Sequence, residues 1–369
     1  MTRARELANL AGVSETALSN RNIILNGSQI IAQRGVSETG ITSGGSYRNA
    51  PDRFRFGLSS AGTWTVSQDS DAPVGFANSY KLDCTTADAS LSAGDYIELL
   101  TGLEGQDLQQ LEKGTSSAKA VTLSFWCKSN KTGTYIVNIQ DTDNGRTIAK
   151  SYTVSIANTW EYKSLSFVGD TSGALDNDNA QSLRVKWWFA AGSTYTSGTL
   201  ATSWEANTAA NYAVGQVNLA DSTDNYFNIT GIQLEVGEQA TPFEHRSYGD
   251  ELTKCMRYYQ QVGGVGNTLA LGQCASTTLV QFFYPLPYPI RADATVSVSD
   301  ATHFRLFNAA ISGIPQVTSM TFVPAGSATN NGFRLYANVA SGLSAGNVSH
   351  LFGNNASGDT GIIKIDAEL

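Results

Sequence analysis

The chain has 369 residues, with 24 basic and 32 acidic side chains and a net charge of −8. Charged residues make up 15% of it, against about 25% in an average globular protein. Together with 35 glycines, this composition favours many short strands joined by turns over helices or disorder. No apolar stretch approaches the ~20 residues needed to cross a bilayer, which predicts a soluble protein without membrane insertion.

The charges are unevenly distributed along the chain. Residues 1–50 hold five basic and three acidic side chains (+2), residues 51–245 hold 12 and 22 (−10), and residues 246–369 hold 7 and 7 (0). A protein that binds a phosphate backbone needs a clustered basic face. The middle segment is therefore predicted to bind no nucleic acid, whereas neutral glycans remain compatible with it.

The first 50 residues combine two apolar patterns. Residues 3–18 place small and aliphatic side chains near one helical face, which predicts a short amphipathic helix. The run to residue 34 contains isoleucine-rich, strand-like pieces around the turn dipeptide Asn26-Gly27. Because such a strip needs a neighbour to bury it, residues 1–50 are predicted to serve oligomerisation or docking to a larger particle.

Residues 51–245 contain one strand-like segment after another, separated by turns rich in Gly, Asn, Asp and Ser. The predicted strands are 79–84, 95–100, 120–128, 134–142, 146–154, 159–168, 182–190 and 226–237. Segment 102–114 is predicted as a helical excursion. Eight antiparallel candidates at near-regular spacing predict a β-sandwich of the jelly-roll type.

A predicted helical linker, 246–262, with its helix at 250–262, leads into a second β-rich unit, 263–369. Its predicted strands are 277–284, 295–300, 303–307, 318–323, 332–339 and 361–369. The predicted fold class is all-β: a short N-terminal helix or anchor, a jelly-roll (galactose-binding-like) β-sandwich and a C-terminal β-sandwich-like domain.

Cysteine, histidine and acidic residues show no strong metal signature. The four cysteines lack CxxC pairs and are predicted to be small buried apolar residues, and the three histidines share no ligand-like spacing. Two short loops offer several oxygens of the kind that calcium prefers, and turn formation explains the same residues. These loops contain Asp141, Asp143 and Asn144, and Asp176, Asp178 and Asn179. No cofactor is predicted, and a structural calcium ion remains an open alternative.

Strand alternation indicates which aromatic side chains point away from the core. Trp126, Trp160, Tyr162 and Trp188 fall on the polar sides of their strands, as do Asn138, Arg184 and Lys186. Because sugars are held by aromatic platforms with a few polar anchors, these seven residues are predicted to line one glycan-binding groove. Packing beneath loops or at a subunit interface is the alternative. Trp64 and Trp204 lie in turn-rich stretches and are expected to cap the sandwich.

No catalytic signature accompanies this pattern. The chain lacks the GxSxG, HExxH and P-loop motifs, and no pair of carboxylates is marked by sequence for glycoside hydrolysis. It also lacks the internal repeats of a long β-helix. The prediction is a protein that is not an enzyme.

Four blocks of sequence resemble one family. They are residues 51–84, residues 105–135, residues 189–205 and, most specifically, NITGIQLEVGEQATPFEHRSYGDELTKCMRYYQ at 228–260. Together they resemble bacteriophage tail-fibre or virion-fibre proteins of the type found in marine phages, which carry a carbohydrate-binding-module-like jelly roll. The resemblance covers about residues 20–262, and residues 263–369 resemble more weakly the variable distal domain of such fibres.

The resemblance implies a homotrimeric structural and adhesion component of a virion, on the tail or the capsid surface. Residues 1–50 would then attach to phage tail or capsid proteins, and the remainder would recognise bacterial surface polysaccharide without catalysis. A purely structural decoration protein of the capsid or tail is the alternative, followed by a glycan-degrading spike.

Overall fold

The structure is a computed structural model that describes residues 20–264, 268–307, 314–324, 331–353 and 357–369. The helix expected at 3–18 lies outside the described residues. The chain forms two compact units, one within residues 1–251 together with Leu369 and the other comprising residues 252–368. Among the described residues, no helix is long and apolar enough to cross a membrane.

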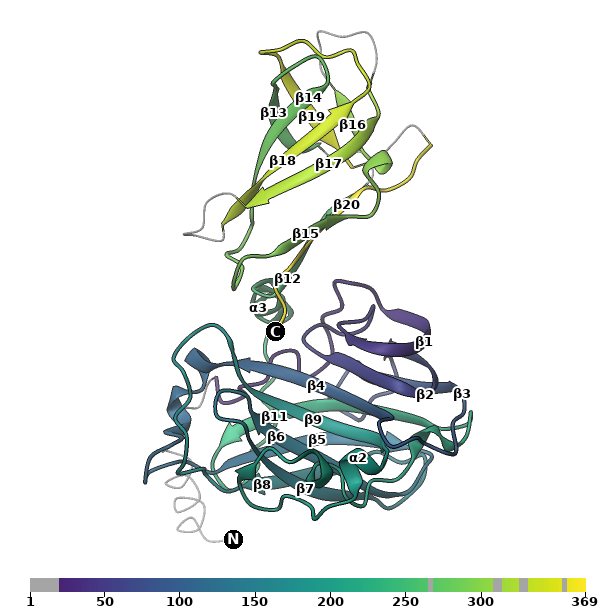
Figure 1. Ribbon diagram of the computed structural model, residues 1–369, viewed down its shortest axis with the longest axis vertical. Coiled ribbons are helices and arrows are strands. Elements are labelled where there is room, and N and C mark those ends of the chain that lie inside the picture. The colour runs from purple at the N-terminus through teal and green to yellow at the C-terminus, as the bar shows by residue number, and fades with distance from the viewer. Residues whose placement is uncertain (1–19, 265–267, 308–313, 325–330, 354–356) are drawn as a thin grey trace. The chain divides into compact units, whose positions relative to one another are not determined.

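The first unit is a β-sandwich (Figure 1). Its strands are β1 (Ser37–Ser46), β2 (Arg55–Asp69), β3 (Ser79–Thr86), β4 (Tyr96–Glu104), β5 (Val121–Ser129), β6 (Gly133–Asp141), β7 (Arg146–Val154), β8 (Glu161–Phe167), β9 (Gln181–Ala191), β10 (Glu205–Ala206) and β11 (Tyr226–Val236). Its short helices are α2 (Ser193–Thr196) and four 3₁₀ turns, Gly105–Asp107, Gln109–Leu111, Ala209–Asn211 and Leu219–Asp221.

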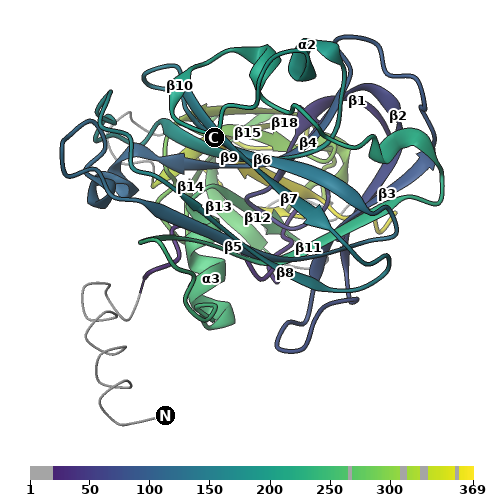
Figure 2. The same ribbon diagram turned by 90° about the horizontal axis from the view of Figure 1, so that it is seen from below.

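Two antiparallel layers form this sandwich. We call the order β10-β7-β6-β9-β4-β2 sheet I and the order β2-β3-β11-β5-β8 sheet II. Figure 2 shows β6 and β9 in one layer and β5, β8 and β11 in the other, with α2 on the side of sheet I. The chain changes layer repeatedly, from β4 to β5 to β6 and from β7 to β8 to β9, which is the jelly-roll pattern.

Strand β2 belongs to both layers. Its first part, Arg55–Ser59, pairs with β4 in sheet I, and its second part, from Thr63 onward, pairs with β3 in sheet II. Gly62 lies at the corner with φ +80°, and a Cβ there would lie 2.2 Å from the carbonyl oxygen of Thr86. Only glycine satisfies both the positive φ and this close approach.

The core lies between the two sheets and is rich in aromatic side chains. Phe125 of β5 contacts Trp187 of β9 edge-on, with ring centroids 6.0 Å apart, and Phe227 of β11 contacts Phe189 of β9 at 4.8 Å. Trp64 is fully buried in the same core, so its expected capping position was wrong. All four cysteines are buried, as predicted.

The second unit is also all-β. Helix α3 (Tyr248–Met256) precedes β12 (Tyr259–Gly263), β13 (Thr268–Cys274), β14 (Leu279–Pro285), β15 (Thr295–Val298), β16 (Arg305–Phe307), β17 (Val317–Pro324), β18 (Gly332–Val339), β19 (Val348–Phe352) and β20 (Ile362–Asp366), with a 3₁₀ turn at Ala301–His303. These strands form a three-stranded sheet, β12-β20-β15, and a six-stranded sheet, β16-β19-β13-β14-β18-β17.

The all-β fold class and the eight predicted strands of the sandwich are confirmed. Segment 102–114 is not a helix, because β4 continues to Glu104 and only two 3₁₀ turns follow. The predicted helix at 250–262 ends at Met256, since the buried Tyr259 starts a strand. The strand-like pieces at 20–34 are irregular chain instead, held on β11 by hydrogen bonds from Ile23 N to Leu234 O and from Ile232 N to Gly27 O.

Candidate functional site

The seven residues predicted to line one groove lie on two different surfaces. Trp126, Trp160 and Tyr162 belong to the outer face of sheet II, where Trp126 of β5 pairs with Tyr162 of β8. Asn138, Arg184, Lys186 and Trp188 belong to the outer face of sheet I, on β6 and β9. The prediction of a single groove was wrong, because alternation within a strand does not specify which layer the strand joins.

The first surface, which we call the aromatic face, comprises Phe76, Trp126, Trp160 and Tyr162. The Tyr162 side chain is 45% exposed, and its ring centroid lies 5.4 Å from that of Trp126. Trp126 and Trp160 are half-buried. Partly exposed aromatic rings present the flat apolar surface that suits a sugar ring.

A bulge in β11 positions the rings of this face. The register between β11 and β5 shifts between Thr230 and Gln233, and Gly231 within the bulge has φ +62°. A Cβ on Gly231 would lie 2.7 Å from Phe76 Cζ and 3.1 Å from Trp126 Cδ1. Glycine at 231 therefore lets the two rings approach the backbone closely, which is a common use of a bulge.

Asp71 supplies the polar anchors beside these rings. Its Oδ1 accepts a hydrogen bond from Trp160 Nε1 at 3.0 Å, and its Oδ2 accepts one from Lys128 Nζ at 2.7 Å. Burial raises the pKa of Asp71, but the hydrogen bonds from Lys128 and Trp160 outweigh it and leave the pKa below its ordinary value. The carboxyl group is thus held ionised, as a hydrogen-bond acceptor.

The second surface, which we call the charged face, comprises Arg55 of β2, Glu98 of β4, and Arg184 and Lys186 of β9. Lys186 Nζ pairs with Glu98 Oε2 at 2.5 Å and lies 4.8 Å from the ring centroid of Trp188. Burial lowers the pKa of Lys186, Glu98 opposes this, and the positive charges of Arg184 and Arg55 lower it further. Three cations therefore share one neighbourhood with one carboxylate.

Two of the residues predicted to bind a glycan, Trp188 and Asn138, are buried beneath the surface of the charged face and cannot contact a ligand. Trp188 is 1% exposed, because Tyr195 and Tyr212 from the segment after β9 pack on it with ring centroids 5.2 and 6.2 Å away. Asn138 is fully buried and accepts a hydrogen bond from Trp188 Nε1 at 3.2 Å. For Trp188, packing beneath a loop is the correct interpretation.

Several residues of these two faces were missed in the sequence. Arg55 and Glu98 follow the alternation of side chains along β2 and β4. The alternation argument that predicted an outward Arg184 would also have identified them. Phe76 and Asp71 lie in the loop between β2 and β3, and no periodic signal marks a loop residue.

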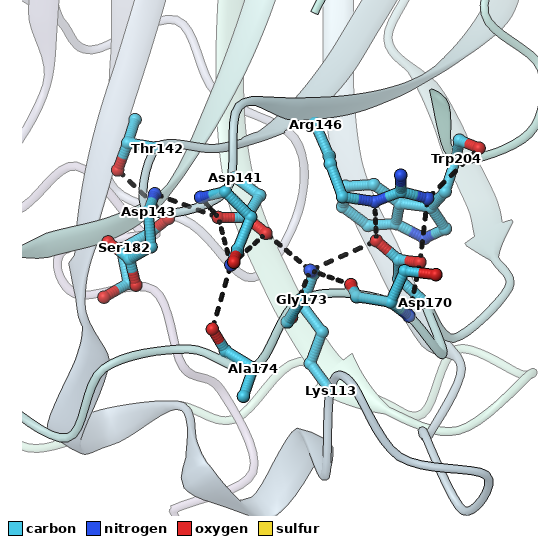
Figure 3. Close-up of polar contacts among 12 residues, drawn as sticks. Lys113, Asp141, Thr142, Asp143, Arg146, Asp170, Gly173, Ala174, Ser182 and Trp204 are labelled. Atoms are coloured by element: carbon cyan, nitrogen blue, oxygen red, sulfur yellow. Dashed lines mark hydrogen bonds and ion pairs between the residues drawn. The ribbon is translucent and has the colours of Figure 1, made fainter. Parts of the chain in front are cut away.

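A buried ion cluster lies at one end of the sandwich (Figure 3). Lys113 Nζ contacts Asp141 Oδ2 at 2.5 Å and Asp170 Oδ2 at 3.1 Å, and it donates to the carbonyl oxygens of Ser172 and Gly173 at 3.0 and 2.8 Å. Arg146 donates to both oxygens of Asp170 through Nε and Nη2 at 2.6 and 3.0 Å. We call Lys113, Asp141, Arg146 and Asp170 the lysine cluster.

The contacts of the lysine cluster test whether the loop of Asp141, Asp143 and Asn144 can hold a calcium ion. The Oδ1 atom of Asp141 accepts from the backbone N–H groups of Asp143 and Asn144 at 3.0 and 2.9 Å, which is turn formation. Its Oδ2 atom binds the Lys113 ammonium. A tethered cation thus occupies the centre of the oxygen set, and these residues do not fit a divalent ion. Across the described residues, no three His, Cys, Asp or Glu side chains gather as metal ligands.

The second predicted oxygen loop, at Asp176, Asp178 and Asn179, also forms internal contacts. Asp178 Oδ1 accepts from Ala180 N at 2.9 Å, and Asp176 N donates to Asp143 Oδ2 at 3.0 Å. Trp204, expected to cap the sandwich, is half-buried, and Lys113 Nζ lies 5.3 Å from its ring centroid.

The most specific sequence block, 228–260, holds the N-terminal segment in place. Glu244 accepts hydrogen bonds from the backbone N–H groups of Asn20 and Asn22. Arg246 donates to the carbonyl oxygens of Asn22 and Ile24. Arg246 also pairs with Glu244 and Glu251 at 3.5 and 3.3 Å. We call Asn22, Glu244, Arg246 and Glu251 the N-terminal clasp, and its residues are part-buried or buried rather than open to a ligand.

Comparison with known proteins gives matches among solved structures. No family model matches the chain, and no curated protein matches it. The tailspike protein 4 enzymatically active domain of bacteriophage CBA120 is 13% identical with a TM-score of 0.30, and the match covers 59% of this chain and 22% of that one. The chain therefore spans about a fifth of that domain's length.

Two carbohydrate-binding modules are also similar. A family 11 module from Clostridium thermocellum, solved with a β-1,3-1,4-mixed-linked tetrasaccharide, is 13% identical with a TM-score of 0.28, over 57% of this chain and 99% of the module. The module TmCBM61, solved with β-1,4-galactotriose, is 9% identical with a TM-score of 0.29, over 59% of this chain and 100% of the module. These saccharides are ligands of those modules.

Proposed function

We propose that this protein is a structural and adhesion component of a phage virion, on the tail or capsid surface, that binds a glycan of the bacterial surface without catalysis. The observation that carries the proposal is the aromatic face. Partly exposed rings of Trp126 and Tyr162 lie beside the polar anchors Asp71 and Lys128. This combination of flat apolar surface and a few hydrogen-bonding groups is what saccharide sites require.

The state of the carboxylates supports binding without hydrolysis. A glycosidase needs a general acid whose pKa is raised, whereas the pKa of Asp71 lies below its ordinary value. On the opposite side, Glu98 is engaged by the Lys186 ammonium. Each of these two carboxylates is thus arranged as a fixed acceptor.

The virion assignment rests on the resemblance of residues 228–260 to phage fibre proteins. The N-terminal clasp is in keeping with an attachment role for residues 1–50, because it joins Asn22 and Ile24 firmly to the sandwich. An anchor transmits attachment to the rest of the chain only if it is tied to the folded unit.

Trimer formation is part of the same proposal and has support in the second unit. The outer face of its six-stranded sheet exposes Leu271, Phe283 and Val348 by 55–60% of their surface. Leu271 pairs with His350, which pairs with Phe307, so apolar and aromatic side chains adjoin across three strands. An exposed apolar patch of this kind is typical of an interface, and a second copy of the chain is the occupant we propose.

Binding of the full chain to an array of bacterial surface polysaccharides tests the adhesion role. We expect binding that falls at least tenfold in Trp126→Ala and in Tyr162→Ala, because each removes part of the platform. Tyr288→Ala, an exposed aromatic of the second unit, is the matched control and should bind as the wild type does. Absence of binding to every polysaccharide, with the chain present on purified virions, would instead support the structural decoration role.

Light scattering tests the oligomeric state. We expect a mass of three times 39.3 kDa for the full chain, and a monomer for Leu271→Lys. A monomeric wild-type chain would contradict the trimer.

A further inference from the structure

The charged face holds an excess of positive charge on a unit that is otherwise acidic. Residues 51–245 have 12 basic and 22 acidic side chains, yet Arg55, Arg184 and Lys186 adjoin here around the single carboxylate of Glu98. Within the described residues, Lys186 is ion-paired at 2.5 Å, and neither Arg55 nor Arg184 has a carboxylate partner. Two guanidinium groups thus lack a counter-charge.

Strand register brings these groups together. Arg184 and Lys186 are successive outward residues of β9, and Leu100, which pairs with Lys186, pairs on its other side with Arg55. Arg184 Nε donates to Gln140 Oε1 at 2.6 Å, which fixes the stem of its guanidinium group. The Arg184 side chain is only partly buried, so its remaining N–H groups are available to a ligand.

An unsatisfied donor on the same face points to an acceptor-rich ligand. Within the described residues, Arg55 Nε is buried and has no hydrogen-bond partner. A buried donor without an acceptor destabilises the folded protein. An anionic oxygen ligand accepts from N–H groups and also balances positive charge.

Aromatic side chains flank the cations. Tyr195 and Tyr212 are half-buried and pack on Trp188, and Tyr195 also contacts Tyr96 with ring centroids 5.6 Å apart. Tyrosine offers an apolar ring with a hydroxyl group at its tip, which suits the two sides of a sugar. The cations therefore lie next to rings of the kind that saccharide sites use.

We propose that the charged face binds an acidic saccharide, with Arg184 and Arg55 holding the carboxylate of a uronic acid and Tyr195 and Tyr212 contacting its ring. This inference rests on the proposed glycan-binding function and names the chemical class of one ligand. It also assigns a second binding surface, on the side of the sandwich opposite the aromatic face. Arginine suits this role because its planar fork matches a carboxylate bidentately.

Calorimetric titration of the full chain tests the inference with two sets of probes. The acidic probes are oligogalacturonate and oligoalginate, and the neutral probes are galactan and mixed-linked glucan oligosaccharides. We expect an acidic probe to bind, with an affinity that falls as salt rises and that Arg184→Gln lowers at least tenfold. Lys119→Gln is the matched control, because it removes one positive charge from an exposed pair with Glu112 and should leave the affinity unchanged.

The outcomes separate this inference from the proposed function. Binding of acidic probes that Arg184→Gln leaves unchanged, or that Lys119→Gln weakens equally, overturns the charged face as the site. Failure of every acidic probe, with neutral probes binding in a manner sensitive to Trp126→Ala, overturns the acidic specificity and leaves glycan binding standing. Failure of all probes and of the polysaccharide array overturns both. Inorganic sulfate at equal ionic strength should compete with the acidic probe only if the anionic group is what the arginines hold.

Discussion

Removing the Lys113 ammonium should destabilise the sandwich strongly. Lys113 is 5% exposed, and its partners Asp141 and Asp170 are 0% and 3% exposed. The lysine cluster is neutral, with two cations and two carboxylates, and Lys113→Met leaves one buried negative charge in excess. Removing one partner of a buried ion pair costs about 3–5 kcal/mol.

The remaining contacts place the expected cost near the lower end of that range. Asp141 keeps three donors, from the backbone of Asp143 and Asn144 and from the Asn144 side chain, and Asp170 keeps Arg146. The carbonyl oxygens of Ser172 and Gly173 lose a donor. We therefore expect about 3 kcal/mol, which is roughly a hundredfold change in the unfolding equilibrium constant.

Urea unfolding followed by tryptophan fluorescence measures this change. All six tryptophans lie between residues 64 and 204, so the signal reports on the sandwich and not on the second unit. Lys119→Met is the matched control, because Lys119 is 47% exposed and 3.7 Å from Glu112, and such surface pairs contribute about 0–1 kcal/mol. Equal shifts of the unfolding midpoint in the two variants would refute the argument.

Acidification provides an independent check of the same reasoning. Burial raises the pKa of Asp170, but hydrogen bonds from Arg146, Ser172 and Lys113 outweigh it and leave the pKa below its ordinary value. A carboxyl group whose pKa is lower in the folded state than in the unfolded state stabilises the folded protein at pH values above its unfolded pKa of about 3.9. This stabilisation is lost as the pH falls through the pKa of the folded state. The difference in the free energy of unfolding between wild type and Lys113→Met should therefore become smaller below about pH 4. A gap that widens there would contradict an electrostatic origin.

Three further predictions concern other parts of the molecule. Gly231→Ala should lower polysaccharide binding on the array and cost about 1–2 kcal/mol in the urea assay, because a Cβ there meets Phe76 at 2.7 Å in a left-handed backbone; unchanged binding would argue against the aromatic face. Arg246→Ala should expose the N-terminal segment to proteolysis near residue 22, since it removes the pairs with Glu244 and Glu251, and mass spectrometry of the digest would show whether that cleavage appears. Burial raises the pKa of Cys127 to about 12 and that of Cys84 to about 11, so at pH 8 these thiols should react with Ellman's reagent only after denaturation, and rapid reaction of native protein would contradict their burial.

Strand alternation predicted local orientation well and long-range placement poorly. Trp126 and Tyr162 point outward as predicted, because the period of two is a property of each strand alone. The layer that a strand joins depends on chain connections, and for this reason Trp188 and Trp126 were assigned to one groove although they lie on separate sheets.

Contacts between segments far apart in the chain could not be predicted from the sequence either. Lys113 lies 28 positions before Asp141, and no local pattern links a lysine in a turn to a carboxylate at the end of a later strand. The burial of Trp188 depends on Tyr195 of the one-turn helix α2 and on Tyr212, which follows the 3₁₀ turn Ala209–Asn211. Such short elements carry no periodic signal in the sequence. The phage resemblance located the block 228–260 but did not reveal that its charged residues hold residues 20–26.

The shared strand β2 has a consequence for how the sandwich can open. Two layers that are joined only by loops and side chains can open separately. Here the backbone hydrogen bonds of a single strand run from β4 into β3 across the corner at Gly62. Unfolding of either sheet therefore removes β2 from the other sheet as well. The amide hydrogens of sheets I and II should then exchange with solvent in one common opening event. The two outer faces of the sandwich should therefore keep their relative positions until the whole unit unfolds.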